Sequence, residues 1–240
     1  MDFAIIAAGE GSRLAKSGYP FPKPLARLQG ETLIERLMDI FDSYGANAVN
    51  IIINEDSEAL ADYLYSFCSE RRIRIIKKTT ASSLHSFHEL LKEIPSFDEL
   101  CVTTVDTIFK KEDFAAYLKF FNERQDLDAL MAVTPFVEDE SPLYVQINHK
   151  GEITAFTDKQ NQEGSENILV SGGVYALRKR ALLCVEKAIA SNIERMRNYQ
   201  RLLLEEQLKV EAFTFEKIID IDHLTDLHTA EAWLNELKMS

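Results

Sequence analysis

Short apolar runs alternate with amphipathic segments throughout the first half of the chain. The apolar runs predict strands at residues 3–8, 48–54, 72–78, 99–106 and 129–135, and the second of them is rich in β-branched residues. Apolar residues at helical spacing predict helices at 31–43, 56–70, 83–92 and 111–122. This alternation requires right-handed crossovers, which make the strands parallel and place helices on both faces of the sheet. We therefore expect a Rossmann-like, three-layer α/β/α domain.

After residue 135 the pattern changes. Residues 144–148 and 152–158 flank a short turn and predict a β-hairpin. The remaining elements are expected to be a strand with two glycines at 168–178, two helices within 179–208, a strand at 210–215, and a strand leading into a terminal helix at 218–237. The expected sheet is mixed but mainly parallel, with the hairpin as a small insertion.

Composition and charge restrict the class of protein. No linker composition or internal repeat divides residues 1–240, so one domain is expected. The net charge of -12 and the lack of an aromatic stacking platform argue against nucleic acid or an anionic membrane as partner. The three cysteines are far apart, and residues 3–8 are too short for a signal peptide. These features favour a cytoplasmic protein that binds small molecules.

Two glycines, Gly9 and Gly11, directly follow the first predicted strand and suggest a phosphate-binding loop. The dinucleotide-binding pattern requires a third glycine where this chain has Leu14. The P-loop pattern fails as well, because Glu10 and Ala15 occupy its two glycine positions. Both common phosphate-binding motifs are therefore excluded.

The motif at residues 9–14, followed by Pro-Lys-Pro-Leu at 22–25, instead resembles the signature of the nucleotidyltransferases that make nucleotide sugars. Lys23 follows Arg13 by ten residues, as it does in that family. The resemblance covers nearly the whole chain. It implies a GT-A-like fold and the transfer of an NMP group from an NTP to a sugar 1-phosphate, with release of pyrophosphate.

Residues 1–135 are expected to form the NTP-binding half. Glycines at 9 and 11 let backbone N–H groups approach a triphosphate, and Arg13 offers forked donors to the leaving pyrophosphate. Lys23 would stabilise charge that develops on the α-phosphate. The predicted catalytic residues are Arg13, Lys23 and Asp106. The resemblance implies a nucleotide site formed by Ala7, Ala8, Gly9, Gly11, Ser12, Arg13, Lys23, Thr80, Ser82 and Ser83.

The resemblance also implies an essential Mg²⁺, with Asp106 as a ligand. Asp220 and Asp222 match the family's second metal-binding element, and period-two alternation would put both on one face of a strand. Which of the two binds the metal is left open. The alternative is a purely structural role, in which all three carboxylates cap the helices that follow them.

Residues 136–240 are expected to form the acceptor-binding half with the terminal helix. The resemblance assigns Asp158, Lys159, Gly172 and Gly173 to the acceptor site, but Gln160 and Leu143 depart from the residues typical of hexose enzymes.

One alternative is a cytidylyltransferase for choline phosphate or a similar alcohol phosphate, because residues 80–87 resemble the corresponding loop of those enzymes. An inactive nucleotide-binding domain is the other. The oligomeric state is not predicted.

Overall fold

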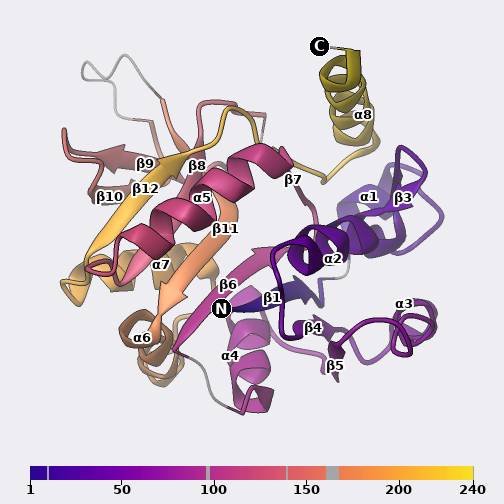
Figure 1. Cartoon of the computed structure of the whole chain (residues 1–240), viewed down its shortest axis with the longest axis horizontal. Helices are drawn as coiled ribbons and strands as arrows, with labels where there is room; N and C mark the ends of the chain where they lie inside the picture. The colour runs from indigo at the N-terminus through magenta and orange to yellow at the C-terminus, as the bar shows by residue number, and fades with distance from the viewer. Residues whose placement is uncertain (10, 96–97, 139, 161–167, 240) are drawn as a thin grey trace.

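A nine-stranded sheet forms the centre of the molecule (Figure 1). The structure is a computed structural model and describes residues 1–9, 11–95, 98–138, 140–160 and 168–239. The sheet contains β1 (Asp2–Ala7), β4 (Val49–Ile53), β5 (Ile73–Lys77), β6 (Glu99–Thr104), β8 (Ala129–Thr134), β9 (Tyr144–Ile147), β10 (Ile153–Thr157), β11 (Val170–Arg178) and β12 (Val210–Thr214).

The N-terminal half of the sheet is parallel, in the order β6-β1-β4-β5. β1 shows why both faces are covered. Phe3, Ile5 and Ala7 belong to one buried cluster, whereas Ala4 and Ile6 belong to another on the opposite face. A strand with apolar side chains on both faces is stable only between two layers of helices.

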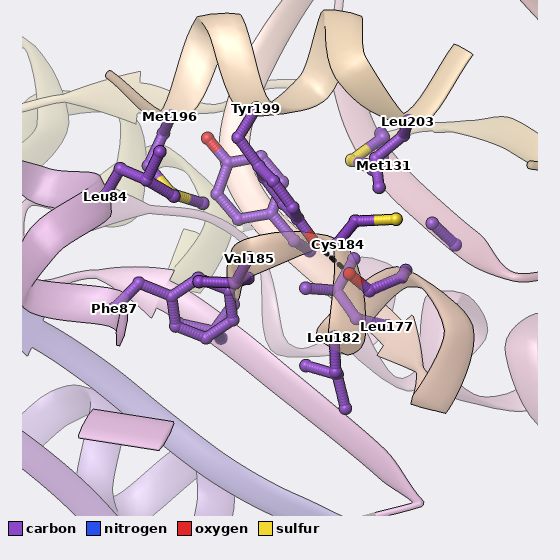
Figure 2. Close-up of a cluster of buried hydrophobic side chains, with 14 of the residues drawn as sticks. Leu84, Phe87, Met131, Leu177, Leu182, Cys184, Val185, Met196, Tyr199 and Leu203 are labelled. Atoms are coloured by element: carbon purple, nitrogen blue, oxygen red, sulfur yellow. Dashed lines mark hydrogen bonds between the residues drawn. The ribbon is translucent and has the colours of Figure 1, made fainter. Parts of the chain in front are cut away.

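Helices supply those two layers (Figure 1). The face of Phe3 and Ile5 packs against α2 (Leu33–Ser43), α3 (Glu58–Tyr65) and α5 (Lys111–Glu123). The face of Ala4 and Ile6 packs against α4 (Ser83–Glu93), α6 (Lys179–Ala190) and α7 (Met196–Glu205). Figure 2 shows part of this second layer, where Phe87, Val185 and Tyr199 come from three different helices. The predicted three-layer architecture is confirmed.

The C-terminal half makes the sheet mixed. β11 lies between β6 and β8 and runs antiparallel to both, and β12 pairs in parallel with β8. The predicted hairpin is present as β9 and β10, beside the start of β11. The assignment of residues 1–240 to a single domain stays a prediction.

Short elements surround the carboxyl ends of the parallel strands. The sequence analysis did not predict α1 (Ser12–Lys16), η1 (Lys23–Leu25), β2 (Arg27–Leu28), β3 (Glu31–Thr32) or β7 (Thr107–Ile108), whereas β13 (Ile219–Asp220) is the strand expected before the terminal helix. Side chains of α1, β2, β7 and β13 share a third buried cluster with that helix, α8 (Leu224–Met239). This cluster fixes residues that are more than 200 positions apart in the chain relative to one another.

Several predicted boundaries were wrong by one to five residues. The helix expected at 31–43 begins at Leu33, because Thr32 caps it by accepting a hydrogen bond from the Glu35 N–H. The helix expected to reach residue 70 ends at Tyr65, and bonds such as Phe67 N–H to the Leu64 carbonyl continue as tighter turns. The strand expected to end in an acid stops at Thr104, so Asp106 lies in the turn between β6 and β7.

Within the described residues, no helix has the length and apolar character needed to cross a bilayer.

Candidate active site

Two adjoining cavities open at the carboxyl ends of the parallel strands. The N-terminal cavity has a volume of about 470 Å³ and is lined by the glycine loop, Lys23 and residues 79–83. The C-terminal cavity has a volume of about 480 Å³ and is lined largely by residues 134–143, β11, the start of α7 and residues 218–226. Both are lined by Ser82, Ser83, Thr104 and Asp222, so a ligand in one cavity would meet a ligand in the other at this boundary.

Gly11 allows the loop and Lys23 to approach closely. It caps α1 in the left-handed conformation, with φ 59°, and its carbonyl accepts a hydrogen bond from the Ala15 N–H. A Cβ at this position would lie 2.8 Å from the Cβ of Lys23. Both the positive φ and the contact therefore require glycine. The predicted residues Ala8, Gly9, Gly11, Ser12 and Arg13 all line the N-terminal cavity, whereas Ala7 is buried in the core.

Lys23 is the most enclosed cation of the site, with 9% of its side chain exposed. Its Nζ forms an ion pair with Asp106 and lies 2.9 Å from Oδ1 of Asp222. Arg13 forms an ion pair with the other carboxylate oxygen of Asp222. Burial by itself lowers the pKa of Lys23, but the charges of Asp106, Asp220 and Asp222 outweigh it and raise the pKa above its usual value. Lys23 is therefore a permanent cation.

Pairing of β7 with β13 brings the predicted acids together. Asp220 lies opposite Thr107 in this pairing, and the Ile221 N–H donates to the Asp106 carbonyl at 3.1 Å. Asp220 is exposed to the C-terminal cavity, where loss of solvation, followed by the nearby charge of Asp106, raises its pKa well above the usual value. Burial acts in the same direction on Asp106, but Lys23 outweighs it and keeps the pKa of Asp106 low. The two carboxyl groups thus lie close enough for each to affect the pKa of the other.

The helix-capping alternative does not account for these carboxylates. The side chain of Asp226 accepts the N–H groups of Asp222 and His223, at 2.8 and 2.6 Å, where α8 begins. Among the described residues, no side-chain hydrogen bond caps α5. Asp106 and Asp222 instead direct their carboxylates at Lys23.

The Ser/Thr loop at residues 79–83 serves two purposes. Ser82 caps α4 by accepting from the His85 N–H, and Thr80 shares a hydrogen bond of 2.6 Å with Ser86. Thr80, Ser82 and Ser83 also line the N-terminal cavity, as predicted. The capping and nucleotide-binding interpretations are therefore compatible.

The predicted acceptor residues fall into two groups. Gly172 and Gly173 line the C-terminal cavity. Gly173 has φ 73°, and a Cβ there would meet Thr107 Oγ1 at 2.9 Å. Asp158 and Lys159 do not line either cavity, and Asp158 forms ion pairs with Arg197 and Arg201. Their assignment to the acceptor site stays a prediction.

Several lining residues were missed by the sequence analysis. Asn54 directly follows β4 and Thr104 ends β6 at the N-terminal cavity, and the rule that ligands bind at carboxyl ends of parallel strands would have pointed to them. Arg197 and Gln200 line the C-terminal cavity from α7. Nothing in their local sequence indicates a binding role, because the rest of that segment reads as an ordinary amphipathic helix.

Comparison with known families agrees with this geometry. Residues 3–202 match the model of the MobA-like NTP transferase domain. The chain belongs to this family. The predicted resemblance to nucleotidyltransferases is thereby confirmed, and the match includes the glycine loop, Lys23 and Asp106, whereas Asp220 and Asp222 lie beyond it.

Individual relatives of this NTP transferase are distant. The bifunctional protein GlmU of Gloeobacter violaceus is 21% identical over 239 residues, which are 97% of this chain and 51% of GlmU. A probable glucose-1-phosphate cytidylyltransferase of Bacillus subtilis is 27% identical over 67 residues, 28% of this chain and 26% of that protein. The chain thus spans about half, or less, of the length of these curated relatives.

The fold has close structural counterparts. The inositol-1-phosphate CTP transferase from T. maritima superimposes with a TM-score of 0.79 at 16% identity, covering 98% of this chain and 96% of that one. At this identity the likeness establishes the fold alone.

Proposed function

We propose that this protein transfers an NMP group from an NTP to a sugar 1-phosphate and releases pyrophosphate. The observation that carries the proposal is the position of Lys23, which lies in the N-terminal cavity and pairs with Asp106 and with Asp222, a residue at the boundary between the two cavities. The NTP would occupy the N-terminal cavity and the acceptor the C-terminal cavity. Lys23 would then lie at the α-phosphate, where the two substrates meet.

Nucleotidyl transfer depends on positioning the substrates and neutralising their charge, and it does not require a general base. An oxygen of the acceptor phosphate forms a bond to the α-phosphorus, while the bond from that phosphorus to the α–β bridging oxygen breaks and pyrophosphate leaves with its electrons. The acceptor phosphate is largely ionised near neutral pH, so no proton has to be removed from it. Lys23 neutralises charge on the α-phosphate and Arg13 neutralises charge on the leaving group.

Mg²⁺ fits the carboxylates of this site. Oδ1 of Asp106 is buried and has no hydrogen-bond partner among the described residues, and Asp220 lies beside it. Across the described part of the chain, no three His, Cys, Asp or Glu side chains form a complete metal cage. Mg²⁺ commonly uses one or two carboxylates and completes its octahedron with water and substrate phosphate. When bound, it would neutralise phosphate charge.

We assign Asp106 and Asp220 as the residues that would hold Mg²⁺. Asp222 has a different position, because its two carboxylate oxygens are paired with Arg13 and Lys23. It would keep the two cations in place before the NTP arrives.

A second candidate is a cytidylyltransferase that uses the phosphate of choline or another alcohol. The structural counterpart from T. maritima is a CTP transferase for inositol 1-phosphate, and one curated relative is a probable cytidylyltransferase. Both support CTP as the nucleotide, and the first supports a polyol phosphate as acceptor.

A substrate panel tests these candidates. The four NTPs are each combined with several sugar 1-phosphates, inositol 1-phosphate and choline phosphate, and pyrophosphate release is measured with Mg²⁺ and with excess EDTA. We expect turnover with one NTP, loss of turnover in EDTA, and recovery when Mg²⁺ is restored. Turnover with choline or inositol phosphate alone would favour the second candidate. No turnover with any pair would favour an inactive nucleotide-binding domain.

A further inference from the structure

Asp158 forms ion pairs with two arginines of one helix, Arg197 and Arg201. Its Oδ1 accepts from Nη1 of Arg197 at 2.9 Å, and its Oδ2 accepts from Nη2 of Arg201 at 2.8 Å. Both carboxylate oxygens are therefore engaged by the protein. Since Asp158 also lies outside the cavity lining, it is poorly placed to bind the hydroxyl groups of an acceptor.

The two arginines differ in what they face. Arg197 lines the C-terminal cavity, and its Nη2 also donates to the Ser141 carbonyl at 2.9 Å. Arg201 does not line either cavity, and it donates to the Phe156 carbonyl and to Asn198. The side chains are similarly exposed, at 29% for Arg197 and 26% for Arg201. Arg201 is thus a matched internal control for Arg197.

Helix α7, which carries Arg197, is firmly anchored. Met196 and Tyr199, which flank Arg197 in the sequence, are both buried. The Tyr199 hydroxyl donates to the Ala181 carbonyl at 2.9 Å (Figure 2). The helix therefore presents Arg197 to the cavity from a fixed backbone, and Asp158 and Ser141 set the direction of the guanidinium group.

The charge of the C-terminal cavity makes Arg197 important. The acids that line it are Glu138, Glu140, Asp220, Asp222 and Asp226. Against them, the described lining contains two arginines, Arg195 and Arg197. A dianionic phosphate entering this acidic cavity needs a cation near the reacting end.

Arg197 lines the same cavity as Asp220 and Asp222, which belong to the reacting end. Burial raises the pKa of Tyr175, as do the charges of Asp220 and Asp106, whereas the charge of Arg197 lowers it. The guanidinium group and the two carboxylates are therefore all within electrostatic reach of one hydroxyl group. Arg195 is exposed, and no ion pair orients it among the described residues.

We infer that Arg197 binds the phosphate group of the acceptor and that Asp158 is a positioning residue that orients Arg197. This inference rests on the proposed function and reassigns Asp158 from acceptor contact to support. The planar guanidinium group suits the role, because its forked donors match two phosphate oxygens while other donors stay on Asp158 and Ser141.

Kinetics of four variants test the inference, with the NTP and acceptor that give turnover in the panel. Arg197→Gln should raise the acceptor KM by about tenfold or more and leave the NTP KM within about threefold, because only acceptor binding loses a charged contact. Arg197→Lys should recover part of the loss. Asp158→Asn should raise the acceptor KM by a smaller factor, about three- to tenfold. Arg201→Gln should change it by less than about twofold.

A double-mutant cycle separates positioning from direct contact. If Asp158 acts through Arg197, Asp158→Asn should have almost no further effect in the Arg197→Gln background. An equal effect in both backgrounds would overturn the positioning role. An unchanged acceptor KM in folded Arg197→Gln and Arg197→Lys, with normal wild-type turnover, would overturn the phosphate contact. No wild-type turnover with any acceptor would instead refute the proposed function on which the inference depends.

Discussion

Gly11 shows how a single missing side chain shapes the site. A Cβ at this position would lie 2.8 Å from the Cβ of Lys23, in a backbone with φ 59°. We expect Gly11→Ala to displace Lys23 and lower the rate of pyrophosphate release by about tenfold or more, since misplacement of about an ångström is costly in catalysis.

Gly45→Ala is the matched control for Gly11→Ala. Gly45 also has a positive φ, 73°, but a Cβ added there would have no atom of the described chain within 4 Å beyond its own neighbours. Both variants should lose about 1–2 kcal/mol of unfolding free energy from the left-handed backbone. Only Gly11→Ala should lose activity, and equal activity of the two variants would show that the contact with Lys23 does not matter.

Lys23 and Asp106 are the residues on which the rate should depend most. Lys23→Ala and Asp106→Ala are each expected to slow pyrophosphate release by about 100-fold or more, because the proposed mechanism uses Lys23 at the α-phosphate and Asp106 as a ligand of Mg²⁺. Circular dichroism would establish that the variants are folded. The exposed Lys16, which lines neither cavity, provides the control, and Lys16→Ala should retain nearly full activity. Near-normal turnover in a folded Lys23→Ala variant would refute the assignment.

At the scale of elements, the entry into α2 contains a pH-sensitive contact. Burial, followed by a hydrogen bond with Asp39, raises the pKa of Glu31 from its ordinary 4.5 to about 7. Between these two values the folded protein holds a proton that the unfolded chain has released. Stability should therefore decrease as the pH rises from about 4.5 to about 7, with the full penalty present above that window.

Glu31→Gln tests this dependence because it mimics the protonated carboxyl group at every pH. We expect the variant to melt at a higher temperature than the wild type at pH 8, with the difference vanishing near pH 4. Glu55→Gln, at an exposed position in a turn, should show no such divergence. A melting-temperature difference that is the same at both pH values would contradict the prediction.

At the scale of the whole molecule, strand β11 joins the two halves of the sheet, and Arg178 secures its end. The Arg178 side chain is 13% exposed, lies over the Phe121 ring and pairs with Glu99 at 2.9 Å. It also donates to the carbonyls of Phe121, Arg124 and Leu127, between 2.8 and 2.9 Å, at the end of α5 and the approach to β8. One side chain thus connects β6, α5 and β11.

Arg178→Gln should lower the unfolding free energy by about 3 kcal/mol, because it leaves Glu99 and several carbonyl groups without their donor. Arg180→Gln is the control. The Arg180 side chain is 66% exposed and pairs with Asp128. Because exposed ion pairs contribute little, its removal should lower the unfolding free energy by about 1 kcal/mol or less. Urea denaturation of both variants measures the difference. A loss below about 1 kcal/mol for Arg178→Gln would show that these contacts are dispensable.

The sequence by itself determined the layered fold and the residues of the glycine loop. Periodicity depends on local residue order, so it predicted the alternating strands and helices, and the spacing of Arg13 and Lys23 identified the loop. Tertiary structure alone decided how distant residues combine. Pairing of β7 with β13 places Asp220, but not Asp222, opposite Thr107. The packing of α7 against the hairpin brings Arg197 to Asp158. Such contacts join residues 39 to more than 100 positions apart, and no local pattern of side chains encodes them.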